Sequence, residues 1–443
     1  MSTRLVIENA TVVTVDPDLG DLDRADVLVT DELITAVGPD LVVTDAERVD
    51  GSGMIVLPGF VDTHRHTWQS AIRHSYGDVD PLTYFRDVLG GLGPSYTAED
   101  VRVGTELGAV SALSAGTTTL MDWAHIQNTP DHTEAGIDAL TAAGGRAVFG
   151  YGWPLTADGR WTDASALGHP QDIRRLRAGR LASDDQLVTL AMAARGPEMA
   201  TPEVWRDDLL LARELGLRTS VHVGAYAHNA RHHAVTQYDA AGLLGDDLTF
   251  VHCGHSSDAE IAAIAAAGAT VSLGVQCELN SAGIGDIPLD RLLHHGIRPS
   301  LSGDTETKCA GDMFTQMRMI FGYYRSWTGG GHSALAEPPA LSLRNVLEFA
   351  TIEGARALGL DHKIGSITPG KQADLILLRA TDLNLVPVSD PVAAVVLAAH
   401  EGNIESVLVD GRFVKRAGRM SSDQAPLLAR VEQSNNRLLA ALR

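Results

Sequence analysis

The residues best suited to chemistry in this sequence are histidines and one aspartate that follow short apolar runs. His64 and His66 end the segment LPGFVDTHRH, and His222, His252 and Asp304 follow the runs LRTSV, LTFV and RPSLSG. Positions i and i+2 of a strand face the same side, so His64 and His66 can bind one metal ion together. A single histidine at a strand end is ordinarily a satisfied structural residue, but this combination is typical of a metal site. Three imidazoles and a carboxylate suit Zn²⁺ or Fe²⁺ and leave a position for water.

The segments that carry these residues follow the pattern of a parallel α/β protein. From about residue 57, short apolar runs alternate with Ala- and Leu-rich helical stretches such as DAEIAAIAAAG. Eight runs are candidate strands: IVLPGFVDTH, TTTLMDW, RAVFGYGW, LVTLAMAARG, LRTSVHVG, LTFVHCG, TVSLGVQ and RPSLSGD. Eight such units predict a (β/α)8 TIM-type barrel, in which side chains at the C-terminal strand ends face the active site.

The two ends of the chain indicate a second, smaller unit. Residues 1–56 contain β-branched segments broken by Asp and Gly, and short strand-like runs return after about residue 350. Neither set has an obvious core of its own. We therefore expect residues 1–56 and 360–420 to form one small β-sandwich domain beside a barrel of residues 57–359, and a closing helix within 421–443.

Composition excludes several classes of protein. The chain is 44% hydrophobic and 21% charged, which is ordinary for a globular protein, and its net charge of -21 disfavours nucleic acid or an anionic membrane as a partner. No run approaches the roughly 20 apolar residues of a membrane span, and the N-terminus lacks the apolar core of a signal peptide. Three cysteines (Cys253, Cys277 and Cys309) are too few for a disulfide framework. We expect a cytoplasmic protein.

Two motifs resemble the amidohydrolase superfamily. LPGFVDTHRH is similar to its signature, and ATIEGARALGL followed by KIGSITPGKQADLILL is similar to the segment that re-enters its small β domain. The resemblance covers nearly the whole chain and points to the branch of cytosine and guanine deaminases, S-adenosylhomocysteine deaminase and triazine hydrolases. It implies a metal ion bound by His64, His66, His222 and Asp304, with His252 orienting the water. It also implies a homodimer or a larger homo-oligomer.

The lysines indicate one metal ion per chain. Binuclear members of this superfamily bridge their metals with a carbamylated lysine at the end of the fourth strand. Here Lys308, Lys363, Lys371 and Lys415 all lie beyond the eighth candidate strand, and LVTLAMAARG contains no lysine or glutamate. We expect a single divalent ion, with Zn²⁺ preferred and Fe²⁺ the alternative.

The expected reaction is hydrolysis of a C–N bond in a small heterocyclic substrate, by deamination or by cleavage of a cyclic amide. A divalent cation lowers the pKa of its bound water from about 15.7 toward about 7. The resemblance implies that Asp304 accepts the proton and delivers it to the leaving group, while His252 orients the hydroxide and stabilises the oxyanion.

Other functions remain open at this point. The same hydroxide could displace chloride, an alkylamine or a thiolate from a heteroaromatic ring. A non-catalytic scaffold is disfavoured because every ligand is present. A serine hydrolase and a nucleotide-cofactor enzyme are disfavoured because the chain lacks G-x-S-x-G and G-x-G-x-x-G motifs.

One feature departs from the family pattern. Deaminases of this branch carry His-x-x-Glu after strand five, and that glutamate protonates a ring nitrogen of the substrate. In this chain the run is His222-Val223-Gly224-Ala225. Either another acid substitutes, or the substrate needs no ring protonation. Glu278, which follows the seventh candidate strand on the catalytic face, is a candidate for the substitute.

Four further residues are candidates for substrate binding. Trp68 and Gln69 follow the His-x-His motif, where relatives contact a ring substrate; Trp68 can stack, and Gln69 can both donate and accept hydrogen bonds. Arg195 could pair with a carboxylate or a carbonyl group. His255 could reach either the substrate or the backbone. For Trp68 and Gln69 a packing role is the alternative, and for Arg195 a structural ion pair.

Overall fold

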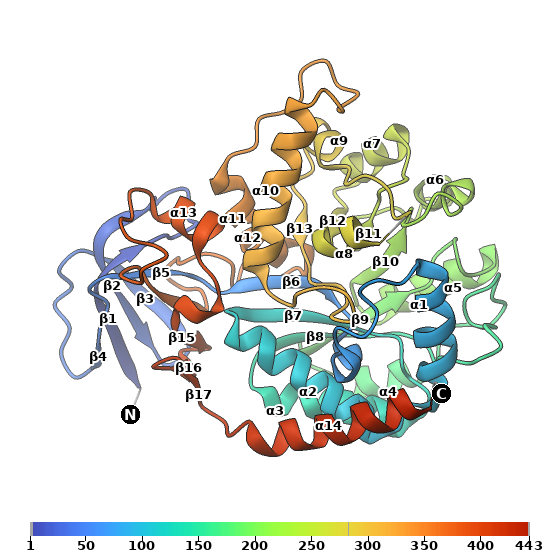
Figure 1. Ribbon diagram of the computed structural model, residues 1–443, viewed down its shortest axis with the longest axis horizontal. Helices are drawn as coiled ribbons and strands as arrows, with labels where there is room; N and C mark the ends of the chain where they lie inside the picture. The colour runs from blue at the N-terminus through green and yellow to red at the C-terminus, as the bar shows by residue number, and fades with distance from the viewer. Residues whose placement is uncertain (1–2, 282, 442–443) are drawn as a thin grey trace.

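The computed structural model describes residues 3–281 and 283–441, which form two sheets (Figure 1). One is an eight-stranded parallel sheet with neighbours in chain order, from β6 to β13. Its strands are β6 (Phe60–Arg65), β7 (Thr117–Ala124), β8 (Arg146–Tyr151), β9 (Val188–Ala194), β10 (Thr219–Val223), β11 (Leu248–His252), β12 (Thr270–Leu273) and β13 (Ser300–Leu301). Each strand overlaps one of the eight predicted runs. A parallel bridge between Arg65 and Asp304 joins the first strand to the chain just after the last and nearly closes the barrel.

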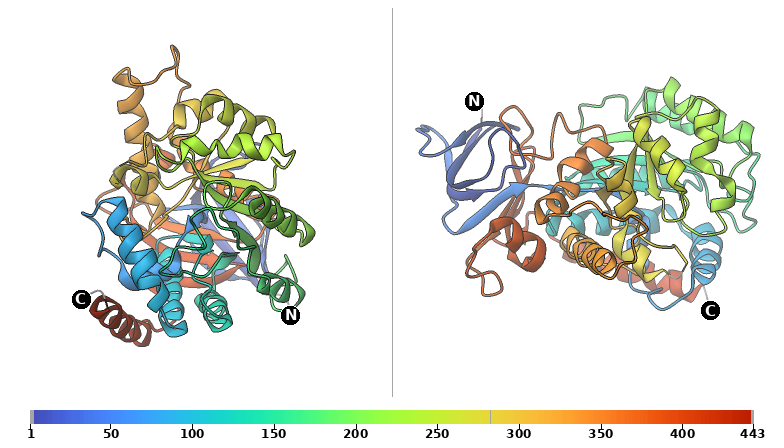
Figure 2. Two further views of the ribbon diagram at one scale, coloured as in Figure 1. Left: turned by 90° about the vertical axis from the view of Figure 1, so that its right-hand side faces the viewer. Right: turned by 90° about the horizontal axis from the view of Figure 1, so that it is seen from above.

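Helices surround the barrel strands (Figures 1 and 2). They are α1 (Pro81–Tyr84), α2 (Ala98–Ser114), α3 (Pro130–Ala143), α4 (Asp172–Ala178), α5 (Pro202–Glu214), α6 (Ala234–Ala240), α7 (Asp258–Ala266), α8 (Val275–Asn280), α9 (Leu289–His294), α10 (Met313–Gly329), α11 (Leu343–Phe349) and α12 (Ile352–Ala357). Capping boxes start three of them: Thr97 pairs with Asp100 before α2, Ser257 with Glu260 before α7, and Ser342 with Asn345 before α11. Such boxes satisfy backbone N–H groups that the first turn leaves free. The sequence therefore fixes where these helices begin.

The second sheet combines both ends of the chain and lies to one side of the barrel (Figure 2). Its strands are β1 (Arg4–Val12), β2 (Leu22–Thr30), β3 (Leu33–Gly38), β4 (Glu47–Asp50), β5 (Met54–Pro58), β14 (Leu375–Arg379), β15 (Ile404–Val409), β16 (Arg412–Arg416) and β17 (Arg419–Met420). β5 pairs antiparallel with β14, and this pairing connects the two ends. Apolar residues from both ends, including Ile7, Val27 and Leu377, share one core. The predicted barrel with a small composite β domain is confirmed.

Two helices remain outside these layers. The short α13 (Pro391–Ala393) precedes β15, and α14 (Ala425–Ala440) runs beside α2 at the end of the chain (Figure 1). Ion pairs of Arg430 with Glu106 and of Arg437 with Asp100 hold α14 against α2. Among the helices of residues 3–281 and 283–441, none has both the length and the apolar character needed to cross a membrane.

Candidate metal centre

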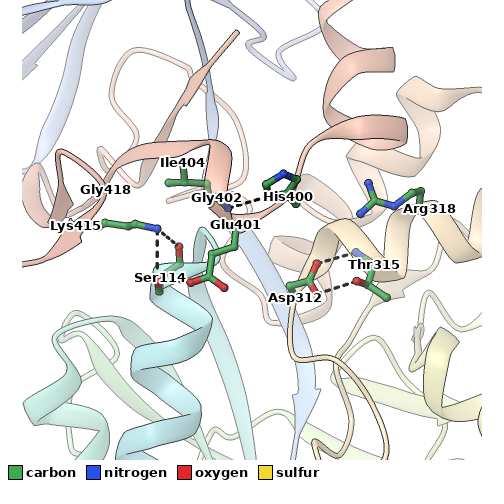
Figure 3. Close-up of a pocket in the computed structure, with 10 residues that line it drawn as sticks. All are labelled: Ser114, Asp312, Thr315, Arg318, His400, Glu401, Gly402, Ile404, Lys415 and Gly418. Carbon is green, nitrogen blue, oxygen red and sulfur yellow. Dashed lines mark hydrogen bonds between the residues drawn. The ribbon is translucent and has the colours of Figure 1, made fainter. Parts of the chain in front are cut away.

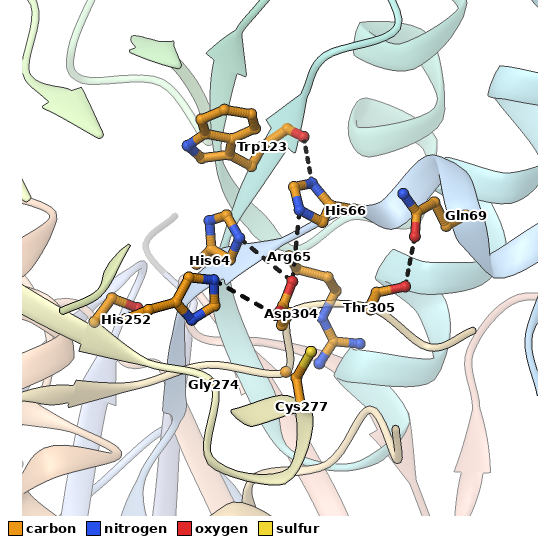
Figure 4. Close-up of polar contacts among 12 residues, drawn as sticks. His64, Arg65, His66, Gln69, Trp123, His252, Gly274, Cys277, Asp304 and Thr305 are labelled. Carbon is orange, nitrogen blue, oxygen red and sulfur yellow. Dashed lines mark hydrogen bonds and ion pairs between the residues drawn. The ribbon is translucent and has the colours of Figure 1, made fainter. Parts of the chain in front are cut away.

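Three predicted ligands converge inside the barrel mouth. His64 and His66 come from the end of β6 and His222 from β10, and one ring nitrogen of each lies within 4.8 Å of the others. The Oδ1 atom of Asp304 lies 3.5 Å from Nε2 of His64 and 3.5 Å from Nε2 of His66 (Figure 4). The structure therefore brings together all four residues of the predicted ligand set.

The backbone holds Asp304 between the two β6 histidines. The N–H of Asp304 donates to the carbonyl of His64 at 2.9 Å, and the N–H of His66 donates to the carbonyl of Asp304 at 2.8 Å. Asp304 adopts φ of 52°, a left-handed conformation that is uncommon outside glycine and concentrates at functional sites. Barrel closure therefore sets the position of the carboxylate relative to the imidazoles.

The donor set fits a divalent metal ion. Both ring nitrogens of His64 and Nδ1 of His222 are buried and lack a hydrogen-bond partner within the described residues. Buried polar groups are normally hydrogen-bonded, so vacant imidazole nitrogens beside a carboxylate indicate ligands. The Nδ1–H of His66 donates to the Trp123 carbonyl at 3.0 Å, which leaves its Nε2 directed at Asp304 (Figure 4). This second contact fixes the tautomer that a metal ligand requires.

The charge states also suit metal binding. Burial, together with repulsion from neighbouring histidines, holds the pKa values of His66 and His222 well below the usual range. Burial alone would raise the pKa of Asp304, but the close approach of His64 and the other nearby histidines lowers it well below its usual value. Neutral imidazoles and an ionised carboxylate are the forms that bind metal.

His252 lies beside this cluster and is oriented by a hydrogen bond to Glu278. Its Nε2 lies 3.9 Å from Oδ2 of Asp304 (Figure 4). Its Nδ1–H donates to Oε1 of Glu278 at 3.1 Å. The same Glu278 oxygen accepts from the N–H of Gly274 at 3.0 Å. Burial opposes charge on His252, but the hydrogen bond to Glu278 and the charge of Asp304 raise the pKa of His252. Burial raises the pKa of Glu278. Glu278, put forward from sequence as a proton donor to the substrate, contacts His252 through Oε1, and its Oε2 is buried without a partner in the described residues.

Gln69 and Trp68 are both fully buried next to the site. The Gln69 amide accepts from the Thr305 hydroxyl (Figure 4) and donates to the Tyr84 hydroxyl at 2.8 Å. Both ends of the amide are therefore engaged within the protein. The Trp68 ring meets Tyr96 edge-on at 4.9 Å between centroids. Both residues pack against protein groups, and Gln69 positions Tyr84; contact of either with a substrate stays a prediction.

Arg195 and His255 also contact protein groups. The fully buried Arg195 guanidinium donates to Asp208 at 2.7 Å and to the Ser165 hydroxyl at 3.0 Å. The structure thus shows the ion-pair alternative for Arg195. The half-buried His255 donates from Nε2 to the carbonyl of Gly283 at 3.2 Å, which is the backbone contact of its two alternatives.

Two residues near the site were missed from sequence. His125 follows β7, and its ring centroid lies 4.5 Å from that of His66; burial lowers its pKa to about 4. Glu198 lies in the loop after β9 and accepts a hydrogen bond from Gly224 at 2.7 Å. His125 and Glu198 both follow barrel strands, so applying the strand-end rule to loops as well as strands would have identified them.

Comparison with known proteins agrees with this geometry. The profile of the Amidohydrolase family matches residues 55–414. A 5′-deoxyadenosine deaminase of Methanosarcina mazei is 26% identical over 98% of both chains. A 5-methylthioadenosine/S-adenosylhomocysteine deaminase of Symbiobacterium thermophilum is 29% identical over 98% of this chain and 99% of the relative.

Solved structures share the fold. An adenosine deaminase from Xanthomonas campestris with bound zinc superposes with a TM-score of 0.86 at 23% identity and covers 99% of both chains. An atrazine chlorohydrolase from Arthrobacter aurescens in complex with zinc and atraton gives a TM-score of 0.84 at 21% identity, over 97% of this chain and 100% of the other. Because the family profile spans most of the sequence, the chain belongs to the amidohydrolase family. Its curated deaminase relatives identify it as a hydrolase acting on carbon–nitrogen bonds.

Proposed function

We propose that this protein uses one divalent metal ion to remove ammonia from an aminated heteroaromatic ring. The observation that carries the proposal is the set of buried imidazole nitrogens, unpartnered among the described residues, that surrounds the Asp304 carboxylate. The rings of Trp123, His125 and Trp153 pack beside this cluster and offer aromatic surfaces for a flat substrate. Relatives that act on adenosine derivatives support an aminated heterocycle as the substrate class.

The contacts of each residue indicate its role in the proposed reaction. His64, His66, His222 and Asp304 would hold the ion, which would activate a water molecule as the nucleophile. Asp304 is ionised and can take a proton from that water and pass it to the departing amine. His252 can donate a hydrogen bond to the oxygen that attacks the ring carbon, and Glu278 keeps the imidazole in the required orientation and tautomer.

Several finer points belong to the same proposal. Zn²⁺ is preferred over Fe²⁺ because three imidazoles and a carboxylate suit it and the solved neighbours contain zinc. A single ion is preferred because β9 carries no lysine. A cytoplasmic homo-oligomer, with a barrel at 57–359 and a composite β domain at 1–56 and 360–420, completes the proposal.

The direct test is ammonia release by the zinc-loaded protein. Adenosine, 5′-deoxyadenosine, 5-methylthioadenosine, S-adenosylhomocysteine, cytosine and guanine would be screened. We expect ammonia from at least one compound with the wild-type protein and none with His64→Ala. A zinc-containing wild-type protein that released ammonia from none of them would overturn deamination.

Displacement of another leaving group is the second candidate. The observation that favours it is the absence of an acid three residues after His222, where Ala225 stands. Atrazine belongs in the same screen, with chloride as the measured product. Chloride release without ammonia release would replace the first proposal with this one.

A further inference from the structure

We propose that Glu198, in the loop after β9, is the acid that protonates the ring nitrogen of the substrate. It takes the role of the glutamate that is missing from the segment after His222. This inference rests on the proposed deamination. It concerns a residue of the barrel mouth that neither the ligand set nor the His252–Glu278 pair uses.

The chemistry requires such an acid. As a C–O bond forms at the ring carbon, the C=N electron pair moves to the ring nitrogen, which must take a proton. Asp304 starts the reaction ionised, and His252 contacts the attacking oxygen, so neither supplies it. With Glu198 as donor, the nitrogen keeps this proton in the lactam product. Asp304 carries one water proton to the leaving ammonia, and the hydroxyl proton released as the carbonyl forms returns to Glu198.

Glu198 lies against the segment that lacks a glutamate. Oε1 of Glu198 accepts from the N–H of Gly224 at 2.7 Å, two residues beyond the ligand His222. Gly224 has φ of 58°, and a Cβ there would lie 2.9 Å from the backbone nitrogen and the hydroxyl of Ser256. The chain therefore turns tightly after His222, and a carboxyl group from the neighbouring strand's loop lies against that turn.

One carboxyl oxygen of Glu198 is anchored and the other is free. Oε1 is held by Gly224, whereas Oε2 makes no hydrogen bond to any other described residue. Glu198 is half-buried, unlike the fully enclosed Glu278. An anchored carboxyl with one unengaged oxygen can donate a proton to a ligand without first breaking a protein contact.

The other buried acids near the ligand cluster are engaged in protein contacts. Oε1 of Glu278 binds His252 while its Oε2 is buried without a partner in the described residues, and Glu306 pairs with Arg73 at 2.8 Å. Asp122 accepts from the Thr67 hydroxyl at 2.6 Å. Each of these carboxylates holds a neighbouring side chain, whereas among the described residues Glu198 is anchored by a backbone N–H alone, so the proton donor is placed at Glu198.

The surroundings of Glu198 suit a proton donor near neutral pH. Burial raises the pKa of Glu198 to about 7, against the lowering effects of the Gly224 N–H and the charge of His252. The other titratable groups around it are Glu260 of α7, Tyr238 of α6 and Cys253 after β11. A general acid works best when its pKa lies near the working pH.

The test compares Glu198→Gln with Glu203→Gln, a matched change at an exposed glutamate in the first turn of α5. Both zinc-loaded proteins would be assayed for kcat/KM against pH, on whichever aminated heterocycle the wild type deaminates. We expect Glu198→Gln to lose about 10²- to 10⁴-fold in kcat/KM. The decline of wild-type kcat/KM above about pH 7 should disappear in this variant. Glu203→Gln should match the wild type in both respects.

A second readout does not depend on turnover. The amide N–H resonance of Gly224 in ¹⁵N-glycine-labelled, zinc-loaded protein should titrate with a midpoint near pH 7, because its acceptor is the Glu198 carboxyl. In Glu198→Gln the Gly224 resonance should no longer shift with pH in this range. The double variant Glu198→Gln with Ala225→Glu should recover part of the activity.

The outcomes separate this inference from the proposed function. A wild type that deaminates, with Glu198→Gln within threefold of it and an unchanged pH profile, overturns the role of Glu198 and leaves deamination intact. A zinc-loaded wild type that deaminates nothing overturns both. A Gly224 resonance that does not respond to pH shows that the carboxyl is not the titrating group.

Discussion

Two polar clusters in this protein differ in whether their groups have partners. The ligand cluster holds His64, whose two ring nitrogens are buried and unpartnered in the described part of the chain. The pocket between α2, α10 and the small sheet, about 520 Å³ in volume, is also lined by polar side chains (Figure 3). There Lys415 donates to the Ser114 carbonyl at 2.8 Å, and the Ser114 hydroxyl donates to Glu401 at 2.6 Å.

This contrast distinguishes polar residues that stabilise the fold from polar residues that form the metal site. In the pocket of Figure 3, Asp312 caps α10 through Thr315 and Arg318 binds the carbonyl of Ala399. These groups satisfy each other and join the barrel to the small sheet. In the ligand cluster the nitrogens are kept apart and face a carboxylate. A hollow is therefore a weaker sign of a site than buried groups that lack partners.

The largest expected effect comes from removing a ligand. His64→Ala should lower kcat/KM by at least about 10³-fold, because several kcal/mol of metal-supplied stabilisation are lost. His294→Ala, at an exposed histidine of α9, is the matched control and should retain activity. Circular dichroism should show both variants folded. Full activity in purified His64→Ala would contradict the ligand assignment.

A smaller effect is expected from changing Glu278, the hydrogen-bond partner of His252. Glu278→Gln should lower kcat by about 10- to 100-fold, the usual cost of losing the partner that orients a functional histidine. Zinc content should stay unchanged, since Glu278 contacts none of the four proposed ligands in the described residues. Steady-state kinetics and metal analysis on the same preparation test this. A variant that lost its zinc would show instead that Glu278 supports metal binding.

A buried ion pair should affect stability more than catalysis. Arg195→Met leaves Asp208 buried without its partner, and breaking such a pair costs about 3–5 kcal/mol in the free energy of unfolding. Denaturant unfolding of the two proteins measures this difference. KM should change little, because Asp208 and Ser165 engage the Arg195 guanidinium. A large rise in KM with an unchanged free energy of unfolding would show that Arg195 binds the substrate.

The smallest effect is expected in the pocket of Figure 3, where the polar side chains bind one another. Ser114→Ala removes the hydrogen bond from the hydroxyl to the exposed Glu401 and a longer one from Lys415 at 3.4 Å. Each such bond is worth about 0.5–1.5 kcal/mol, and activity should be unchanged. Thermal unfolding and the ammonia assay test both parts. A tenfold loss of activity in this variant would mean that the pocket takes part in function.

Much of the fold and of the ligand cluster could be predicted from sequence. The strand-like runs and helical stretches alternate clearly, and a barrel places every strand end at one face, so His64, His222 and Asp304 could be brought together without coordinates. The family resemblance then selected the ligands from among several histidines.

The contacts around the cluster could not be predicted in the same way. The link from Gln69 to Thr305 joins residues that are 236 positions apart. Whether Arg195 faces a substrate or Asp208 depends on where α5 packs. The Glu198–Gly224 bond joins loops after two neighbouring strands, and such loops have no periodicity that sets their geometry.

Metal analysis of the purified protein tests the ligand assignment most directly. Elemental analysis of the wild type, His64→Ala and His294→Ala after reconstitution with Zn²⁺ would give the metal content per chain. We predict about one zinc ion per chain in the wild type and in His294→Ala, and a marked loss in His64→Ala. A wild-type protein that bound neither zinc nor ferrous iron after reconstitution would contradict the metal centre and the hydrolytic function built on it.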